Sequence, residues 1–284
     1  MTVIFGINIK VIYGKVNMPL AMGAAKSLIT ADGKFILVVP HIAIYSVDAA
    51  SSLVLIEKAT PHITNDHVLV YLTGTIAAYL LQYQDYLVLH GSAVLINNCA
   101  VIFSGNSGAG KSTTATALVE RGYKLLTDDV VVIKKDNCGR LVLVPGPARV
   151  KLWKETLAHL NKPIDNLTRI LAKLDKYEYP IDNHYNQSVE ISALYELNHS
   201  PNIQNIEIEK LIGINKLNVV INNTYRYHML KPLGKIPNHL QQSIMLTKLI
   251  QIFKVTRPTQ KFMLEELVKE IIRHAVKPYS SSHE

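Results

Sequence analysis

Cysteine is scarce in this 284-residue chain, which contains only Cys99 and Cys138. Two separated cysteines do not form the framework of bridges that stabilises small secreted proteins, so we expect a reducing, cytoplasmic setting. No cluster of Cys and His has the spacing of a zinc site, which argues against a structural metal. The start of the chain also lacks the residue order of a signal peptide.

Long apolar runs are missing as well. The most apolar stretch, Val68 to Leu81, is interrupted by Thr73-Gly74-Thr75 and is shorter than the roughly 18 to 20 residues that span a bilayer. We therefore expect a buried helix here and no membrane association. No internal repeat or low-complexity tract is found, and disorder is expected only at the ends, for instance over Ser280 to Glu284.

No run of five basic residues occurs, although the formal net charge is +8, so nucleic-acid binding is disfavoured. A positive field of this kind would steer an anion such as ATP, or an acidic peptide. A generic basic surface explains the same charge equally well.

The first part of the chain, residues 1–86, has the pattern of a β-rich region closed by a helix. Three strand-like segments are Phe35 to Val39, Ile42 to Val47 and Leu53 to Ile56. Asp66 is the expected N-cap of the helix that follows.

The remainder, residues 87–284, is expected to form an α/β domain. Strands are predicted at Leu87 to Ile96 and Ala100 to Phe103, joined by a turn at Asn97-Asn98, with a helix over Thr113 to Arg121 capped by Gly122. Further predicted segments are a hairpin turn at Asp136 to Gly139, a helix containing Trp153 and Leu157, a long, partly mobile excursion over 161–190, strands at Ile191 to Leu197 and Glu207 to Leu211, and C-terminal helices carrying Leu240, Ile244, Leu249 and Ile252, then Met263 to Ile272.

Residues 105–112 read Gly-Asn-Ser-Gly-Ala-Gly-Lys-Ser and match the phosphate-binding P-loop pattern, Walker A, without a substitution. The glycines let consecutive N–H groups approach phosphate oxygens, Lys111 adds a positive charge, and the Ser112 hydroxyl can ligate Mg²⁺. A predicted strand precedes the loop and a predicted helix follows it, which is the context the motif requires. The expected nucleotide-binding residues are Gly105, Asn106, Ser107, Gly108, Ala109, Gly110, Lys111, Ser112 and Thr113.

Two aspartates, Asp128 and Asp129, stand beyond the helix that is predicted to follow this loop. Phosphate-binding proteins of this kind hold Mg²⁺ with an acidic residue at the end of a neighbouring strand. One carboxylate can approach the metal while the other acts as a base; an ordinary polar turn is the structural alternative.

His90 stands near the end of the strand that pairs with the one leading into the loop. A lone histidine is more often structural than functional. Here the hairpin through Asn97-Asn98 would return His90 to the phosphate end of the sheet.

At this point the chain resembles HPr kinase/phosphorylase. The resemblance rests on His90-Gly91, the glycine loop, the run from Arg121 to Asp129, and Asn223 to Arg226. It implies ATP and Mg²⁺ as cofactors and assembly into a homo-oligomer. It further implies that Asp128 takes the serine hydroxyl proton, that Asp129 and Ser112 support Mg²⁺, that His90 lies near the transferred phosphoryl group, and that Arg226 offsets its charge.

The chain also departs from that family. The Arg-Gly-Leu-Gly-Ile signature is absent, and residues 1–60 do not match the family's separate N-terminal domain. A closer resemblance is to the HPr-kinase-like proteins of lasso-peptide biosynthesis, carried by Leu89 to Val94, Pro145 to Trp153 and Asn223 to Arg226. Members of that branch phosphorylate a serine at the C-terminal end of a precursor peptide.

Three functions therefore stay open. The first is an ATP-dependent serine kinase acting on a peptide or small protein, most simply a lasso precursor. The second keeps the kinase fold but has HPr or a small hydroxy compound such as free serine as acceptor. The third is a module that senses ATP without transferring phosphate; Asp128-Asp129 argues against it, since a sensor needs no base beside the γ-phosphate.

Overall fold

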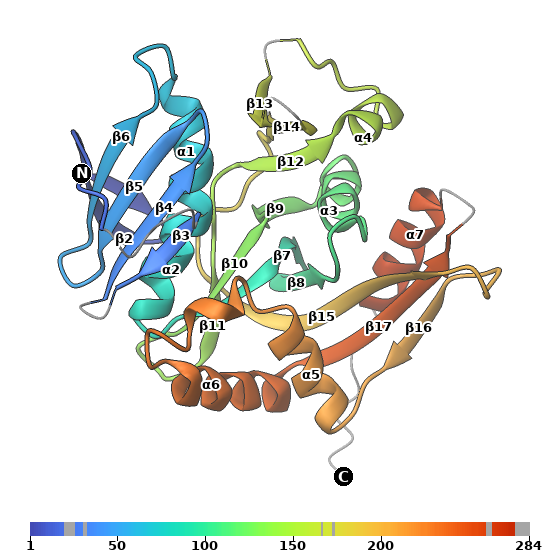
Figure 1. Ribbon diagram of the computed structural model, residues 1–284. Coiled ribbons are helices and arrows are strands. Elements are labelled where there is room, and N and C mark those ends of the chain that lie inside the picture. The colour runs from blue at the N-terminus through green and yellow to red at the C-terminus, as the bar shows by residue number, and fades with distance from the viewer. Residues whose placement is uncertain (20–25, 31–32, 166, 172–173, 260–262, 276–284) are drawn as a thin grey trace.

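The computed structural model describes residues 1–19, 26–30, 33–165, 167–171, 174–259 and 263–275 (Figure 1). It is a mixed α/β structure with three sheets. The predicted disorder of Ser280 to Glu284 lies outside the described residues. No helix in the described part of the chain is long and apolar enough to cross a membrane.

The N-terminal sheet has six strands in the order β1-β2-β6-β5-β4-β3. Their bounds are β1 Thr2–Ile4, β2 Ile7–Tyr13, β3 Ser27–Ile29, β4 Lys34–Val39, β5 Ala43–Asp48 and β6 Leu53–Lys58. In β5 buried and partly buried residues alternate, which places Tyr45 and Val47 in the core. The three predicted strand segments of this region are confirmed.

A helical segment closes this sheet and consists of α1 Asn65–Tyr71, the π-helical η2 Leu72–Ile76 and α2 Ala77–Tyr83. Thr64 is its N-cap and accepts a hydrogen bond from the His67 N–H, so the prediction of Asp66 as cap was wrong: Asp66 lies in the first turn. The segment packs against both the N-terminal sheet and two strands of the next sheet, β7 Leu87–Ile96 and β10 Val130–Lys135, in one shared hydrophobic core.

The second sheet has the strand order β11-β10-β7-β8-β15-β17-β16, with β9 paired to β7. Its strands are β7 Leu87–Ile96, β8 Cys99–Ser104, β9 Lys124–Thr127, β10 Val130–Lys135, β11 Leu141–Val144, β15 Val189–Ser200, β16 Glu207–Lys210 and β17 Gln251–Pro258. β15 runs parallel to both β8 and β17, whereas the other pairs are antiparallel. The three parallel strands therefore end at the same edge of the sheet.

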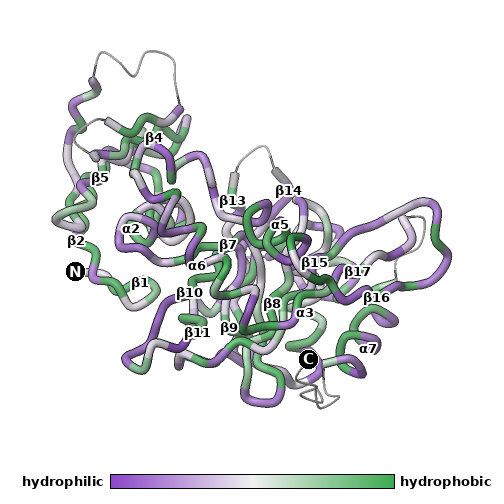
Figure 2. Tube along the Cα trace, turned by 90° about the horizontal axis from the view of Figure 1, so that it is seen from below, coloured by the Kyte–Doolittle hydropathy of each residue, from purple (hydrophilic) through white to green (hydrophobic). Residues whose placement is uncertain are grey.

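Helices cover both faces of this sheet. α3 Lys111–Val119 and α7 Leu264–Ala275 pack on one face, and α5 Ile214–Asn222 and α6 Ile236–Leu249 on the other. Figure 2 shows the hydrophobic stretches of β7 and β8 running through the middle of the molecule. α3 begins two residues before the predicted start and ends at Val119; the N–H of Gly122, in a left-handed conformation, then donates to the Val119 carbonyl.

The third sheet corrects the prediction for residues 161–190. This stretch was expected to be a long excursion, yet it contains β13 Thr168–Leu171 and β14 Leu174–Pro180, which pair with β12 Arg149–Trp153 in the order β12-β14-β13. The sheet is small and its strands are rich in charged and tyrosine residues, so it lacks the apolar run that marks a buried strand. The predicted helix is α4 Lys154–His159; Trp153 precedes it and belongs to β12.

The C-terminal part is helical only in part. Ile252 was assigned to a helix but lies in β17, after α6 has ended at Leu249. Leu240, Ile244 and Leu249 do not form a buried face of α6, since they are 41%, 38% and 58% exposed. In α7 the predicted apolar face is confirmed by the burial of Leu264, Leu267, Val268 and Ile271.

Candidate active site

The glycine-rich loop of residues 105–110 connects the end of β8 to the start of α3, as predicted. Gly105, Gly108 and Gly110 all have positive φ values of 128°, 84° and 90°. A Cβ atom on Gly105 would stand 2.4 Å from the carbonyl oxygen of Leu197 in β15. The loop is thus pressed against the neighbouring strand, and only glycine fits at its entry.

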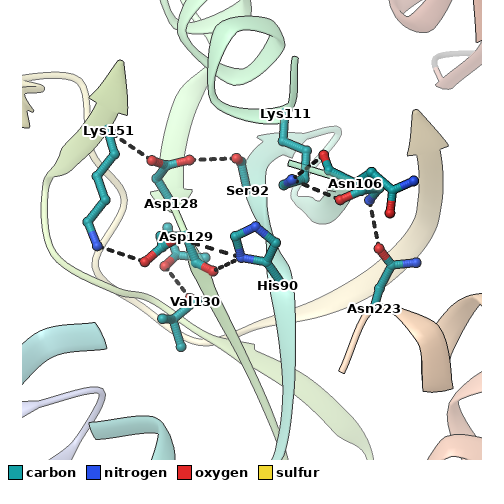
Figure 3. A network of polar contacts seen from close by, with 11 residues as sticks. His90, Ser92, Asn106, Lys111, Asp128, Asp129, Val130, Lys151 and Asn223 are labelled. Carbon is teal, nitrogen blue, oxygen red and sulfur yellow. Dashed lines mark hydrogen bonds and ion pairs between the residues drawn. The ribbon is translucent and has the colours of Figure 1, made fainter. Parts of the chain in front are cut away.

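Lys111 opens α3 and folds back over this loop. Its Nζ donates hydrogen bonds to the carbonyl oxygens of Gly105 at 2.8 Å and Asn106 at 3.0 Å (Figure 3). Burial lowers the pKa of Lys111, and the negative charge of Asp128 opposes that shift. An ammonium group held in this way is positioned at the mouth of the loop, where its charge faces incoming phosphate oxygens.

Asp128 and Asp129 form the turn between β9 and β10, but their side chains have different surroundings. The Asp128 carboxylate is only 8% exposed; its Oδ1 accepts a hydrogen bond from the Ser92 hydroxyl at 2.5 Å and its Oδ2 from the Lys151 backbone N–H at 2.7 Å. Asp129 has a left-handed φ of 70°, which turns its carboxylate to the Lys151 Nζ at 2.7 Å.

The Asp129–Lys151 ion pair dominates the electrostatics of the site. Burial alone would raise the pKa of Asp129, but the Lys151 ammonium at 2.7 Å outweighs it and holds that pKa far below the ordinary value of 3.8. Burial would likewise lower the pKa of Lys151, and Asp129 raises it instead. Both groups therefore stay charged at neutral pH, which suits Asp129 to hold a cation and makes it a weak base.

His90 lies on β7 opposite Val130, directly beside the aspartate turn. Its Nδ1 is 3.0 Å from the Asp129 backbone oxygen and 3.5 Å from the Asp129 carboxylate, and its backbone N–H donates to the Asn223 carbonyl at 2.7 Å. Burial lowers the pKa of His90, with the Asp129 charge acting in the opposite direction. The imidazole is thus neutral at physiological pH, with one nitrogen tied to the turn.

Asn223 ties the loop to the C-terminal part of the chain. Its Oδ1 accepts a hydrogen bond from the Gly105 N–H at 2.8 Å, and its Nδ2 donates to Glu196 of β15 at 3.1 Å. Three residues on, Arg226 is exposed, has a left-handed φ of 47°, and places its guanidinium 5.8 Å from the Tyr225 ring centre.

Two cavities meet at these residues. The loop cavity, of about 180 Å³, is bordered by the glycine loop, the start of α3, β12, β14, β17 and α7; among its walls are Lys111, Ser112, Lys151, Trp153, Lys176 and Arg257. The second cavity, of about 360 Å³, is bordered by the loop and by residues 222–226, including Arg226. His90, Ser107 and Asp129 line both cavities.

The residues of the loop cavity fit a nucleotide. A left-handed glycine loop, a lysine ammonium and the start of a nine-residue helix provide N–H donors and positive charge for phosphate oxygens. They also fit Mg²⁺, because Ser112 and Asp129 line the same cavity, and this ion is usually bound by one or two protein oxygens together with substrate phosphates and water. In the described part of the chain no group of three or more His, Cys, Asp or Glu residues forms a closed metal cage.

Sequence reasoning missed several residues of these cavities. In β12, Val150 and Leu152 are buried, so Arg149, Lys151 and Trp153 share the opposite face, and Lys151 and Trp153 line the loop cavity; this two-residue alternation was readable. Ser92 and Glu196 carried no signal of their own. Arg257 lies at the carboxyl end of a parallel strand, the edge where ligands bind in α/β sheets, but Ile252 near the start of β17 had been assigned to a helix.

Residues 82–148 match the family model described as HPr Serine kinase C-terminal domain. Over 54 residues the chain is 48% identical to the HPr kinase/phosphorylase of Prosthecochloris aestuarii, which is 19% of this chain and 16% of that protein. It is 44% identical over 75 residues to the HPr kinase/phosphorylase of Chlorobium luteolum, an alignment that covers 23% of this chain and 23% of that protein. The chain thus spans no more than about a quarter of the length of these curated relatives.

Among solved structures, the HPr(Ser) kinase/phosphatase of Coxiella burnetii aligns with 66% of this chain and 95% of its own, with a TM-score of 0.36 and 15% identity. The residues that the family model matches comprise the end of α2, β7, β8, the glycine loop, α3 and β9–β11. This is the part of the chain that carries His90, Lys111, Asp128 and Asp129.

Proposed function

We propose that this protein is an ATP-dependent kinase that transfers the γ-phosphoryl group to a serine hydroxyl of a peptide or small protein. The relationship of residues 82–148 to HPr kinase/phosphorylase supports a phosphotransferase. The observation that carries the proposal is the meeting of two cavities at His90, Ser107 and Asp129. A nucleotide in the loop cavity would present its terminal phosphate to an acceptor in the second cavity.

The positive groups of the loop cavity would bind and orient the triphosphate. Lys111, the loop N–H groups and the helix start neutralise phosphate oxygens, as phosphoryl transfer requires. Ser112 and Asp129 would hold Mg²⁺, which when bound neutralises charge that develops on the phosphate oxygens. The lowered pKa of Asp129 supports this role, because the carboxylate remains ionised whatever the pH of the cell.

Asp128 is the proposed base. In the transfer step the serine oxygen bonds to the γ-phosphorus, the bond to the β–γ bridging oxygen breaks, ADP leaves, and the hydroxyl proton passes to the carboxylate. Asp128 already accepts a hydrogen bond from the hydroxyl of Ser92, so its environment suits this kind of donor. An acceptor hydroxyl would replace one of its two present partners, Ser92 or the Lys151 N–H.

The acceptor we favour is a precursor peptide of the lasso type, because the segments Leu89 to Val94, Pro145 to Trp153 and Asn223 to Arg226 resemble that branch. All three contribute to the site: they contain His90 and Ser92, then Lys151 and Trp153, and finally Arg226. HPr is the second candidate, favoured by the names of the curated relatives. We further propose a cytoplasmic, homo-oligomeric enzyme.

Transfer from γ-labelled ATP to a panel of acceptors tests the proposal. The panel consists of a serine-containing precursor peptide, the same peptide with that serine replaced by alanine, HPr, free serine, and buffer alone. We expect Mg²⁺-dependent label on the serine peptide and none on its alanine version. Label on HPr alone would replace the lasso acceptor by HPr; tight ATP binding without label on any acceptor would favour an ATP sensor and reject the kinase.

A further inference from the structure

Arg257 comes from β17, far along the chain from the glycine loop and outside residues 82–148. β17 runs parallel to β15 with Arg257 opposite His199, and β15 runs parallel to β8 with Glu196 opposite Ser104. The carboxyl end of β17 therefore reaches the same edge of the sheet as the loop. This edge is where open α/β sheets bind their ligands.

The guanidinium of Arg257 reaches the loop itself. Its Nη2 donates a hydrogen bond to the Ala109 carbonyl at 3.2 Å, and it borders the loop cavity together with Lys111 and Ser112. A Cβ atom on Gly110 would lie 3.1 Å from that Nη2. The missing side chain at Gly110 thus leaves the space that the guanidinium occupies.

Most hydrogen-bonding capacity of this guanidinium is unused. Its Nε is buried without a hydrogen-bond partner, and within the described residues no carboxylate pairs with Arg257. Burial lowers the pKa of Arg257, but an arginine stays protonated at any physiological pH. Arg257 is half-buried, and a partly desolvated cation without an anion is costly, since buried charges in proteins are normally paired. The pairing anion is then to be sought in the cavity that Arg257 borders.

We propose that Arg257 is a second phosphate-binding cation of the loop cavity, which contacts the phosphate chain of the nucleotide alongside Lys111. The inference rests on the proposed function only in taking a nucleoside triphosphate as the ligand. Lys111 approaches the loop from α3 and Arg257 from β17, so the phosphate chain is held from two elements. The C-terminal strand, which the family match does not cover, thereby becomes part of the nucleotide site.

Equilibrium binding of Mg²⁺-ATP by calorimetry, without any acceptor, tests this role. We expect Arg257→Ala to weaken binding about 10- to 100-fold at low ionic strength, the range of a lost charge-assisted hydrogen bond. Added salt should shrink the difference from the unsubstituted protein, because a lost charge also lowers the salt dependence of binding. Arg257→Lys should keep most of that salt dependence. Arg273→Ala, which removes a guanidinium 71% exposed on α7, is the matched control and should leave binding unchanged.

Inorganic tripolyphosphate, used as a competitor of ATP, separates phosphate recognition from contacts with the base. Arg257→Ala should weaken its binding by the same factor as that of ATP. An unchanged ATP affinity in a folded variant would overturn the proposal, and so would a loss that is equal at all ionic strengths, since that marks Arg257 as a mere support of the Ala109 carbonyl. A failure of phosphoryl transfer in the unsubstituted protein would reject the kinase proposal. The binding test would remain valid in that case, because it uses no acceptor.

Discussion

The two halves of the site differ in how far they resemble known proteins. Residues 82–148 supply the loop, His90 and both aspartates, and this segment is the part related to HPr kinase/phosphorylase. The facing walls come from later segments, which contribute Lys151, Trp153, Lys176, Asn223, Arg226 and Arg257. The first half carries the groups that we propose for phosphoryl transfer, while the second supplies the ammonium of Lys151 that holds the Asp129 carboxylate ionised.

The largest effect is expected in the related half. Asp128→Asn should lower phosphoryl transfer by about 10²- to 10⁴-fold, the usual range for loss of a general base, with ATP affinity nearly unchanged. Single-turnover kinetics and calorimetry measure the two quantities. Asp129→Asn serves as the contrast and should instead raise the Mg²⁺ concentration required for transfer. Full transfer by Asp128→Asn would show that Asp128 is not the base.

The next effect belongs to the half of the site outside residues 82–148 and acts through the Asp129–Lys151 ion pair. Lys151→Met leaves Asp129 without its main partner, and breaking a buried pair costs about 3–5 kcal/mol of unfolding free energy, measured by urea denaturation. The pKa of Asp129 is lowered in the folded protein, so the pair contributes stability above about pH 4 that is lost as the pH falls through that lowered value. In Lys151→Met the free energy of unfolding should depend less on pH in this acid range.

Lys154→Met is the control for that variant, since Lys154 is exposed at the start of α4. It should change the unfolding free energy by less than about 0.5 kcal/mol. If Lys151→Met were equally mild, the charge of Asp129 would not depend on the later half of the site.

A smaller effect is expected for the second cavity, in which we propose that the acceptor binds. Arg226→Ala should raise the KM for a peptide acceptor about tenfold through a lost charged contact, while the KM for ATP changes little, because Arg226 borders only the second cavity. Steady-state kinetics with each substrate varied in turn gives both constants. Lys231→Ala, a nearby exposed cation, should alter neither. A rise in the KM for ATP alone would indicate that Arg226 contacts the nucleotide and not the acceptor.

The smallest effect concerns a histidine behind the acceptor cavity. His239 is buried, lies 2.8 Å from the Thr224 hydroxyl, and has a pKa lowered by burial to about 4. Between pH 6.5 and about pH 4 the histidine is protonated in the unfolded chain but neutral in the folded protein. The free energy of unfolding therefore decreases as the pH is lowered across this interval. Between pH 7 and pH 5, we expect the Tm of the unsubstituted protein to fall by a few degrees more than the Tm of His239→Gln. Thermal unfolding of both proteins at the two pH values measures the difference. Parallel pH dependence in both proteins would contradict this assignment.

Local patterns predicted the related half well and the later half poorly. The strand–loop–helix unit around residues 105–112 and the hairpin that returns His90 to the loop end of the sheet were readable, because turn residues and apolar runs mark them. The sheet of β12–β14 was not, since its pairing joins segments about 25 residues apart whose strands carry few apolar side chains. Lys151 became visible as a partner of Asp129 only once that sheet was in place.

The helical segment from Asn65 to Tyr83 has one more consequence. Its buried side chains belong to the same core as both the N-terminal sheet and Val88, Val130 and Val132 of the second sheet. A Cβ atom on Gly74 would lie 3.8 Å from the Lys151 Nζ and 3.9 Å from the Asp129 Oδ2, so the segment passes close to this ion pair. A helical segment that packs against two sheets couples their folding, because unfolding of either sheet would expose apolar side chains of the core that both share. The N-terminal sheet and the transfer site should therefore melt as one cooperative unit, and any ligand that tightens the site would protect the backbone amides of the distant strands as well.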